Sequence, residues 1–236
     1  MWKDNRVNTK GETSLHLAAK NKNPDGKVSI ENLLTNGIDI NARNKWGQTP
    51  LHYAAIAGCL QNIETLTKSP GIDINSRDIN GYNALQSLIA SNDGESPSFT
   101  DNDRLVFRKS LQALVNAGID VNNQTVFGDS ILHLIALRQD NPSLLKFFIS
   151  NFPDINLDLI NKKNENFFHV YVAEERLKFI VEFFEWIAEK YSGSRLKALV
   201  CSRDIRGKTP WTLMIGNTGV SSNFQKNSSL CRFAIY

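Results

Sequence analysis

The sequence predicts an all-α solenoid of helix-turn-helix units that carry short β-hairpin fingers. A six-residue pattern recurs along the 236 residues, each copy pairs a turn residue with a helix-capping residue two places later, and a second amphipathic segment follows most copies. The copies begin at Gly11, Gly47, Gly81, Gly128, Asn164 and Gly207. Such a regular succession of turn, cap and helix indicates stacked repeats rather than one globular core.

Each copy of the pattern contains the signals for a turn and for the start of a helix. Glycine and asparagine are the residues that most readily accept a left-handed backbone, so a tight turn is expected at the first position. The third position holds residues whose side-chain oxygens can cap a helix: Thr13, Thr49, Asn83, Ser130, Asn166 and Thr209. An inner helix is therefore predicted to begin after each cap.

A second, outer helix is predicted in most units from apolar residues at helical spacing, such as Ile30, Leu33 and Leu34. In the third unit a polar stretch over 91–97 delays this helix to a start near Thr100. In the fifth unit it extends over 176–191 and is followed by a break at 192–194. The sixth unit lacks a convincing outer helix.

The copies Gly-Glu-Thr-Ser-Leu-His at 11–16 and Gly-Gln-Thr-Pro-Leu-His at 47–52 complete the pattern. Over residues 6–216 the sequence thereby resembles the ankyrin-repeat family. The resemblance implies a domain over 1–216 with repeats at about 7–43, 44–77, 78–124, 125–160 and 161–203, and an incomplete one at 204–216. Insertions lengthen the third and fifth repeats. Residues 217–236 are expected to form a poorly ordered C-terminal tail, because they lack an apolar stripe.

Composition excludes several classes of function. The formal net charge is +3 and the basic residues are scattered, so nucleic acid is not an expected partner. No apolar stretch is long enough to span a membrane and the N-terminus lacks a signal peptide. Three cysteines without CxxC spacing indicate reduced thiols and a cytoplasmic location, with the nucleus as an alternative.

The four histidines occupy one column of the pattern, at His16, His52, His133 and His169. Equivalent positions of a solenoid are spread along its axis, so these side chains cannot converge on one metal or substrate. The resemblance implies instead that each imidazole bonds the turn and the adjoining repeat. With no phosphate-binding loop, nucleophile elbow or paired-cysteine site in the sequence, we expect no catalytic residue, no metal and no cofactor.

In the family, partners bind the concave face formed by finger tips and inner helices. The variable positions around each turn glycine are therefore the expected partner-binding residues: Lys10, Lys45, Trp46, Gln48, Ile79, Tyr82, Val126, Phe127, Asp129, Lys163 and Arg206. Three of them are aromatic and come from consecutive fingers, which favours an aromatic strip of the kind that dominates interfaces.

The sequence therefore predicts a monomeric scaffold that binds a protein segment with apolar anchors and some acidic character. Two other interpretations stay open. The chain could be the regulatory or targeting domain of a larger enzyme or channel, or an ankyrin-type bacterial effector that acts in the host cytosol.

Overall fold

The computed structural model describes residues 6–91, 100–138, 143–173, 177–191 and 194–213. Within these residues the fold is all-α, as predicted. The helices are α1 (Ser14–Ala19), α2 (Asp25–Thr35), α3 (Pro50–Ala57), α4 (Leu60–Lys68), α5 (Ala84–Ser91), α6 (Asp101–Asn116), α7 (Ile131–Arg138), α8 (Ser143–Asn151), α9 (Phe167–Ala173), α10 (Leu177–Lys190) and α11 (Ser194–Cys201). The expected tail at 217–236 and most of the insertion at 91–97 lie outside the described residues.

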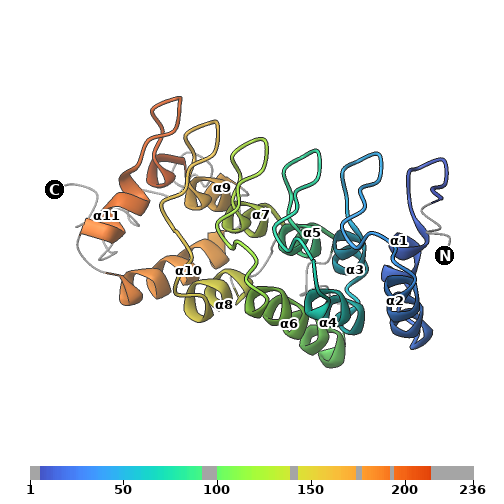
Figure 1. The fold of residues 1–236 in the computed structure, drawn as a ribbon. Coiled ribbons are helices and arrows are strands. Elements are labelled where there is room, and N and C mark those ends of the chain that lie inside the picture. The colour runs from blue at the N-terminus through green and yellow to red at the C-terminus, as the bar shows by residue number, and fades with distance from the viewer. Residues whose placement is uncertain (1–5, 92–99, 139–142, 174–176, 192–193, 214–236) are drawn as a thin grey trace. The chain divides into compact units, whose positions relative to one another are not determined.

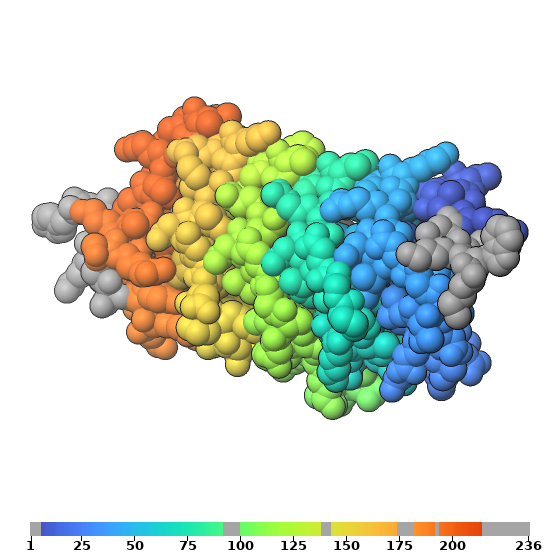
Figure 2. All heavy atoms as spheres, viewed as in Figure 1, coloured from blue at the N-terminus to red at the C-terminus, as the bar shows by residue number. Residues whose placement is uncertain are grey.

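The chain divides into two compact units, residues 1–126 and 127–236. In the N-terminal unit the inner helices α1, α3 and α5 pack in sequence, and the outer helices α2, α4 and α6 do the same (Figure 1). Successive repeats of this unit form adjacent bands in the space-filling view (Figure 2). Leu15, Leu51 and Leu85 fill its core from equivalent positions.

In the C-terminal unit α7 packs against α8 and α9, and α9 contacts α10. Its core combines aliphatic side chains with a cluster of aromatic ones around α9 and α10. Phe167 and Phe168 of α9 lie against Phe183 of α10, with ring centroids 6.3 Å and 6.0 Å apart. The sequence did not predict α11, because the break expected at 192–194 had no helix assigned after it.

The predicted turns and caps are confirmed. The first position of every copy has a left-handed backbone, with φ of 76° at Gly11, 71° at Gly47, 81° at Gly81, 83° at Gly128, 59° at Asn164 and 73° at Gly207. The helix in the third repeat begins immediately after Thr100, whose side chain accepts a hydrogen bond from the Asp103 amide. The local signals in the sequence therefore placed the starts of the inner helices and of α6 correctly.

The fingers contain turns and no regular strand in the described residues, where the one β-bridge joins Ile160 and Asn166. In the second finger the Asn44 amide donates to the Gln48 carbonyl at 3.0 Å, and the Gly47 amide donates to the Asn44 carbonyl at 2.9 Å. This pairing is too short for a strand ladder. The Lys45 amide at the tip donates to the neighbouring finger.

Candidate functional site

Five of the fingers owe their shape to an asparagine or aspartate side chain at the base of the turn, at Asn8, Asn44, Asp78, Asn161 and Asp204. In the second finger the Asn44 Oδ1 atom accepts from the amides of Trp46 at 2.9 Å and Gln48 at 3.0 Å. Asp78 holds the third finger in the same way, through the amides of Asn80 and Tyr82. This column was not predicted from the sequence, although asparagine or aspartate stands three residues before the turn residue in every finger except the fourth, which has Thr125.

A chain of backbone hydrogen bonds links each fingertip to the next within both units. The Lys45 amide donates to the Lys10 carbonyl at 3.1 Å, and the Ile79 amide donates to the Trp46 carbonyl at 3.0 Å. The same bond joins Val126 to Asn80 in the N-terminal unit, and Lys162 to Phe127 in the C-terminal unit. The backbone polar groups at the tips are thus used between fingers, which leaves the side chains to face a partner.

The histidine column has the structural role that was expected. The Nδ1 atom of His16 accepts from the Thr13 amide at 3.1 Å, so its Nε2 atom carries the hydrogen and donates to the Gln48 carbonyl of the next finger at 3.0 Å. His52 bonds Thr49 and the Tyr82 carbonyl identically. Both ring nitrogens are occupied in this way.

Burial lowers the pKa of His16, His52, His133 and His169, against the opposing effect of the backbone carbonyl that each contacts. Desolvation disfavours the charged imidazolium, so the neutral ring is the stable form in the folded chain. In the third repeat Gln86 replaces histidine. Its Oε1 accepts from the Asn83 amide, which reproduces the cap bond without a titratable group. Its Nε2 donates to the Asn123 carbonyl, whereas each histidine contacts the carbonyl of the residue that follows the turn of the next finger.

Most of the predicted partner-binding residues are exposed on the fingers. Trp46 is 42% exposed, Ile79 is 59% exposed and Phe127 is 63% exposed. The other exposed members are Lys10, Lys45, Val126, Lys163 and Arg206, whereas Gln48, Tyr82 and Asp129 are half-buried. Trp46 and Tyr82 belong to the N-terminal unit and Phe127 to the C-terminal unit.

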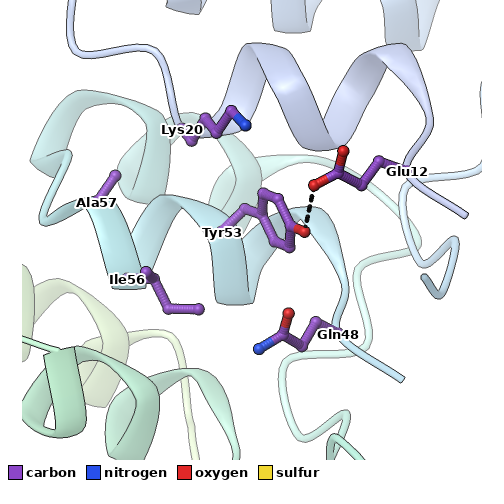
Figure 3. Close-up of a pocket in the computed structure, with 6 residues that line it drawn as sticks. All are labelled: Glu12, Lys20, Gln48, Tyr53, Ile56 and Ala57. Carbon is purple, nitrogen blue, oxygen red and sulfur yellow. Dashed lines mark hydrogen bonds between the residues drawn. The ribbon is translucent and has the colours of Figure 1, made fainter. Parts of the chain in front are cut away.

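An open pocket of about 450 Å³ lies beside these fingers in the N-terminal unit (Figure 3). It is lined by Glu12, Lys20, Gln48, Tyr53, Ile56 and Ala57. Only Gln48 among these was predicted to bind a partner. The sequence does contain a signal for three of the others: Tyr53, Ile56 and Ala57 stand at i, i+3 and i+4 and therefore share one face of α3.

The floor of the pocket is a closed network of hydrogen bonds. The Tyr53 hydroxyl donates to Glu12 Oε1 at 2.6 Å and accepts from Asn44 Nδ2 at 3.0 Å. Asn8 Nδ2 donates to the other Glu12 oxygen at 2.5 Å. The hydrogen bonds from Tyr53 and Asn8 lower the pKa of Glu12, and burial together with Glu12 raises the pKa of Tyr53 to about 12. Glu12 is therefore a carboxylate and Tyr53 a neutral phenol at neutral pH.

The described residues contain no group of three or more histidine, cysteine, aspartate or glutamate side chains placed to hold a metal ion. No helix among them combines the length and the apolar character needed to cross a bilayer. Cys59 is a buried free thiol and Cys201 a half-buried one; Cys231 lies outside the described residues.

Comparison with known proteins supports the predicted resemblance. A family model described as ankyrin repeats in three copies matches residues 2–78. Neurogenic locus notch homolog protein 1 of Xenopus laevis is 30% identical over 161 residues, which cover 68% of this chain and 6% of that protein. Alpha-latrotoxin-Lg1a of Latrodectus geometricus is 38% identical over 87 residues, which cover 36% of this chain and 6% of the toxin. The chain thus spans a small fraction of the curated relatives it matches.

Proposed function

We propose that this chain, which belongs to the ankyrin-repeat family, is a non-catalytic protein-binding module that contacts its partner through fingers and inner helices. Ankyrin repeats are a protein–protein interaction module. One observation supports the proposal above all others: the motif residues are buried in the repeat core, while Trp46 and Ile79 stay exposed on neighbouring fingers. Large exposed apolar side chains at adjacent positions are typical of interaction surfaces.

Charge complements this apolar surface. Lys10 and Lys45 stand on the first two fingers and are exposed. A partner with apolar anchors and acidic neighbours would match them, since complementary charge guides association and fixes the register of an interface. We propose that the chain acts as a monomer in the cytoplasm.

The absence of catalysis is part of the proposal and has a physical reason. A general base needs a ring nitrogen that can reach substrate. In His16, His52 and His133 one ring nitrogen accepts from the helix cap and the other lies within hydrogen-bonding distance of the next finger's carbonyl. These imidazoles serve the fold.

A second candidate is that the chain is the regulatory or targeting domain of a larger enzyme or channel. It is favoured by the small share of each relative that the chain covers, because similar repeats occur there inside much longer proteins. Both candidates use the same surface. Determining the mass of the endogenous protein would distinguish them.

The protein-binding role is tested with a partner isolated by affinity purification and then used in purified form. Trp46→Ala should weaken its binding by about 2 kcal/mol or more without lowering the melting temperature. Leu105→Ala is the matched control, because Leu105 is an equally exposed apolar residue on the outer helix α6. Normal binding by Trp46→Ala together with lost binding by Leu105→Ala would place the interface on the outer helices and overturn the proposal.

A further inference from the structure

Given the protein-binding role proposed above, we infer that the pocket between the first two repeats binds an apolar partner side chain that stands beside a carboxylate. The apolar group would lie on Tyr53 and Ile56, and Lys20 and Gln48 would hold the carboxylate. The pocket volume of about 450 Å³ is within the range of sites that enclose a small ligand or a side chain with its neighbour.

The walls of the pocket provide the apolar contact. Tyr53 presents its ring there, Ile56 is 36% exposed, and Ala57 continues the same face of α3 (Figure 3). The phenol cannot bind a partner strongly through its hydroxyl, because that group already donates to Glu12 and accepts from Asn44. What Tyr53 offers is therefore the ring.

The polar groups left at the rim are donors. Asn44 Oδ1 accepts from two finger amides, so its Nδ2 is the donor to the Gln48 side chain at 3.2 Å and identifies the Gln48 atom as Oε1. The Gln48 Nε2 group is thereby left with its hydrogens. Within the described part of the chain, no acceptor contacts this nitrogen or the Lys20 ammonium.

Lys20 determines which charge the pocket favours in a ligand. Its Nζ atom lies 5.8 Å from the centroid of the Tyr53 ring, at the exposed edge of the pocket. Glu12 carries the opposite charge, but it is 6% exposed and both of its oxygens accept hydrogen bonds from Tyr53 and Asn8. An entering group therefore meets a cation and an amide donor first, which fits a carboxylate and disfavours an ammonium.

The test uses three small probes on the whole chain: N-acetyl-Leu-Glu-amide, N-acetyl-Leu-Gln-amide and N-acetyl-Leu-Lys-amide. Amide chemical shifts of the Gln48 side chain and of Ala57 report occupancy of the pocket. The glutamate probe should bind at least about tenfold more tightly than the other two, as expected for charge-assisted hydrogen bonds. Equal binding of all three probes, preference for the lysine probe, or no shift at Gln48 would overturn the inference.

Variants separate the pocket from general charge effects. Lys20→Met should weaken the glutamate probe by about tenfold, and Gln48→Met by a smaller factor. Lys68→Met is the matched control, because it removes the same charge from the exposed end of the outer helix α4 and should leave binding unchanged. Equal loss in Lys20→Met and Lys68→Met would show that net charge, not the pocket, attracts the probe.

Failure of the pocket is distinguishable from failure of the protein-binding role. If the purified partner is weakened by Trp46→Ala but is indifferent to Lys20→Met, the pocket assignment is wrong and the protein-binding role stands. If Trp46→Ala binds the partner normally and Leu105→Ala does not, the proposed protein-binding role of the fingers is wrong.

Discussion

The N-terminal unit, residues 1–126, and the C-terminal unit, residues 127–236, contain the same finger over different cores. Leu51 and Leu85 are buried in the first core, and the second core adds large aromatic side chains such as Phe148 and Phe183 to leucines such as Leu132. The cap-to-histidine bonds and the bonds between fingertips are nevertheless the same in both units. Turn chemistry therefore specifies the finger, while the core tolerates a change of residue type as long as it stays filled.

Truncating a core side chain should expose the difference between the units most strongly. Phe148→Ala is expected to cost about 3–5 kcal/mol and Leu51→Ala about 2–5 kcal/mol, because each leaves a cavity where a fully buried group had packed. Chemical denaturation gives the size of each loss. Hydrogen exchange then shows where stability is lost. The loss should be confined to the unit that carries the substitution, since repeats couple mainly to their neighbours. An equal loss of protection in both units after either change would show that they unfold as one.

A methyl group added at the turn tests how closely neighbouring fingers approach. In Gly81→Ala the new Cβ would lie 2.8 Å from the Val126 amide nitrogen, at a φ of 81° that already disfavours alanine. We expect a loss of about 2 kcal/mol or more from the two effects together. The matched control is Gly207→Ala in the C-terminal unit, where φ is 73° and the Cβ meets no described atom within 4 Å. Gly207→Ala should lose only the stability that the unfavourable φ costs. Identical melting curves for the two variants would refute the close approach at Gly81.

The sequence predicted turns and the starts of the inner helices, because each depends on residues within one six-residue copy. The role of the histidine column followed instead from the family resemblance, since the bond from His52 to the Tyr82 carbonyl joins two repeats. The pocket depends on groups from two repeats: Glu12 and Lys20 come from the first, Tyr53 and Ile56 from the second. Pairing across that distance requires the stacking register of the repeats, which no single copy contains. The aromatic packing of α9 against α10 escaped prediction for the same reason.

The histidine column predicts acid sensitivity. Burial lowers the pKa of His52, so below pH 6.5, the usual histidine value, the unfolded chain binds a proton that the folded chain resists. The stabilising contribution of each histidine is complete above that pH and is lost as pH falls. The slope is at most about 1.4 kcal/mol per pH unit for each histidine. Thermal melts between pH 8 and pH 5 measure it.

Gln86 supplies the matched variant for this experiment. His52→Gln should keep the hydrogen bond from the Thr49 amide, as Gln86 keeps the one from the Asn83 amide, and make the decline between pH 6.5 and pH 5 shallower. His52→Ala should lose about 1–3 kcal/mol even at pH 8, since it leaves the Tyr82 carbonyl and the Thr49 amide without their partner. An unchanged pH slope in His52→Gln would mean that carboxylates and not histidines govern the acid response.

The smallest expected effect concerns the loops that join neighbouring repeats of the N-terminal unit. Asn41 Nδ2 donates to the Gly71 carbonyl at 2.7 Å, and its Oδ1 accepts from the Asp73 amide at 2.8 Å. Asn75 makes the equivalent of the second bond one repeat later, where its Oδ1 accepts from the Asp120 amide at 2.7 Å. One side chain thus satisfies a donor and an acceptor of the next loop, which adds a polar link between two repeats.

Removing this link should cost little because the bonds are solvent-exposed. Asn41→Ala is expected to lower the free energy of unfolding by about 1 kcal/mol and to increase hydrogen exchange at Asp73. Asn41→Asp keeps the oxygen that accepts from the Asp73 amide and removes the donor to Gly71, so it should lose less. Thr35→Val is the control, because the Thr35 hydroxyl donates to the Glu31 carbonyl within α2 and links no second repeat. If Thr35→Val raised exchange at Asp73 as much as Asn41→Ala, the protection would come from the repeat as a whole and not from the asparagine.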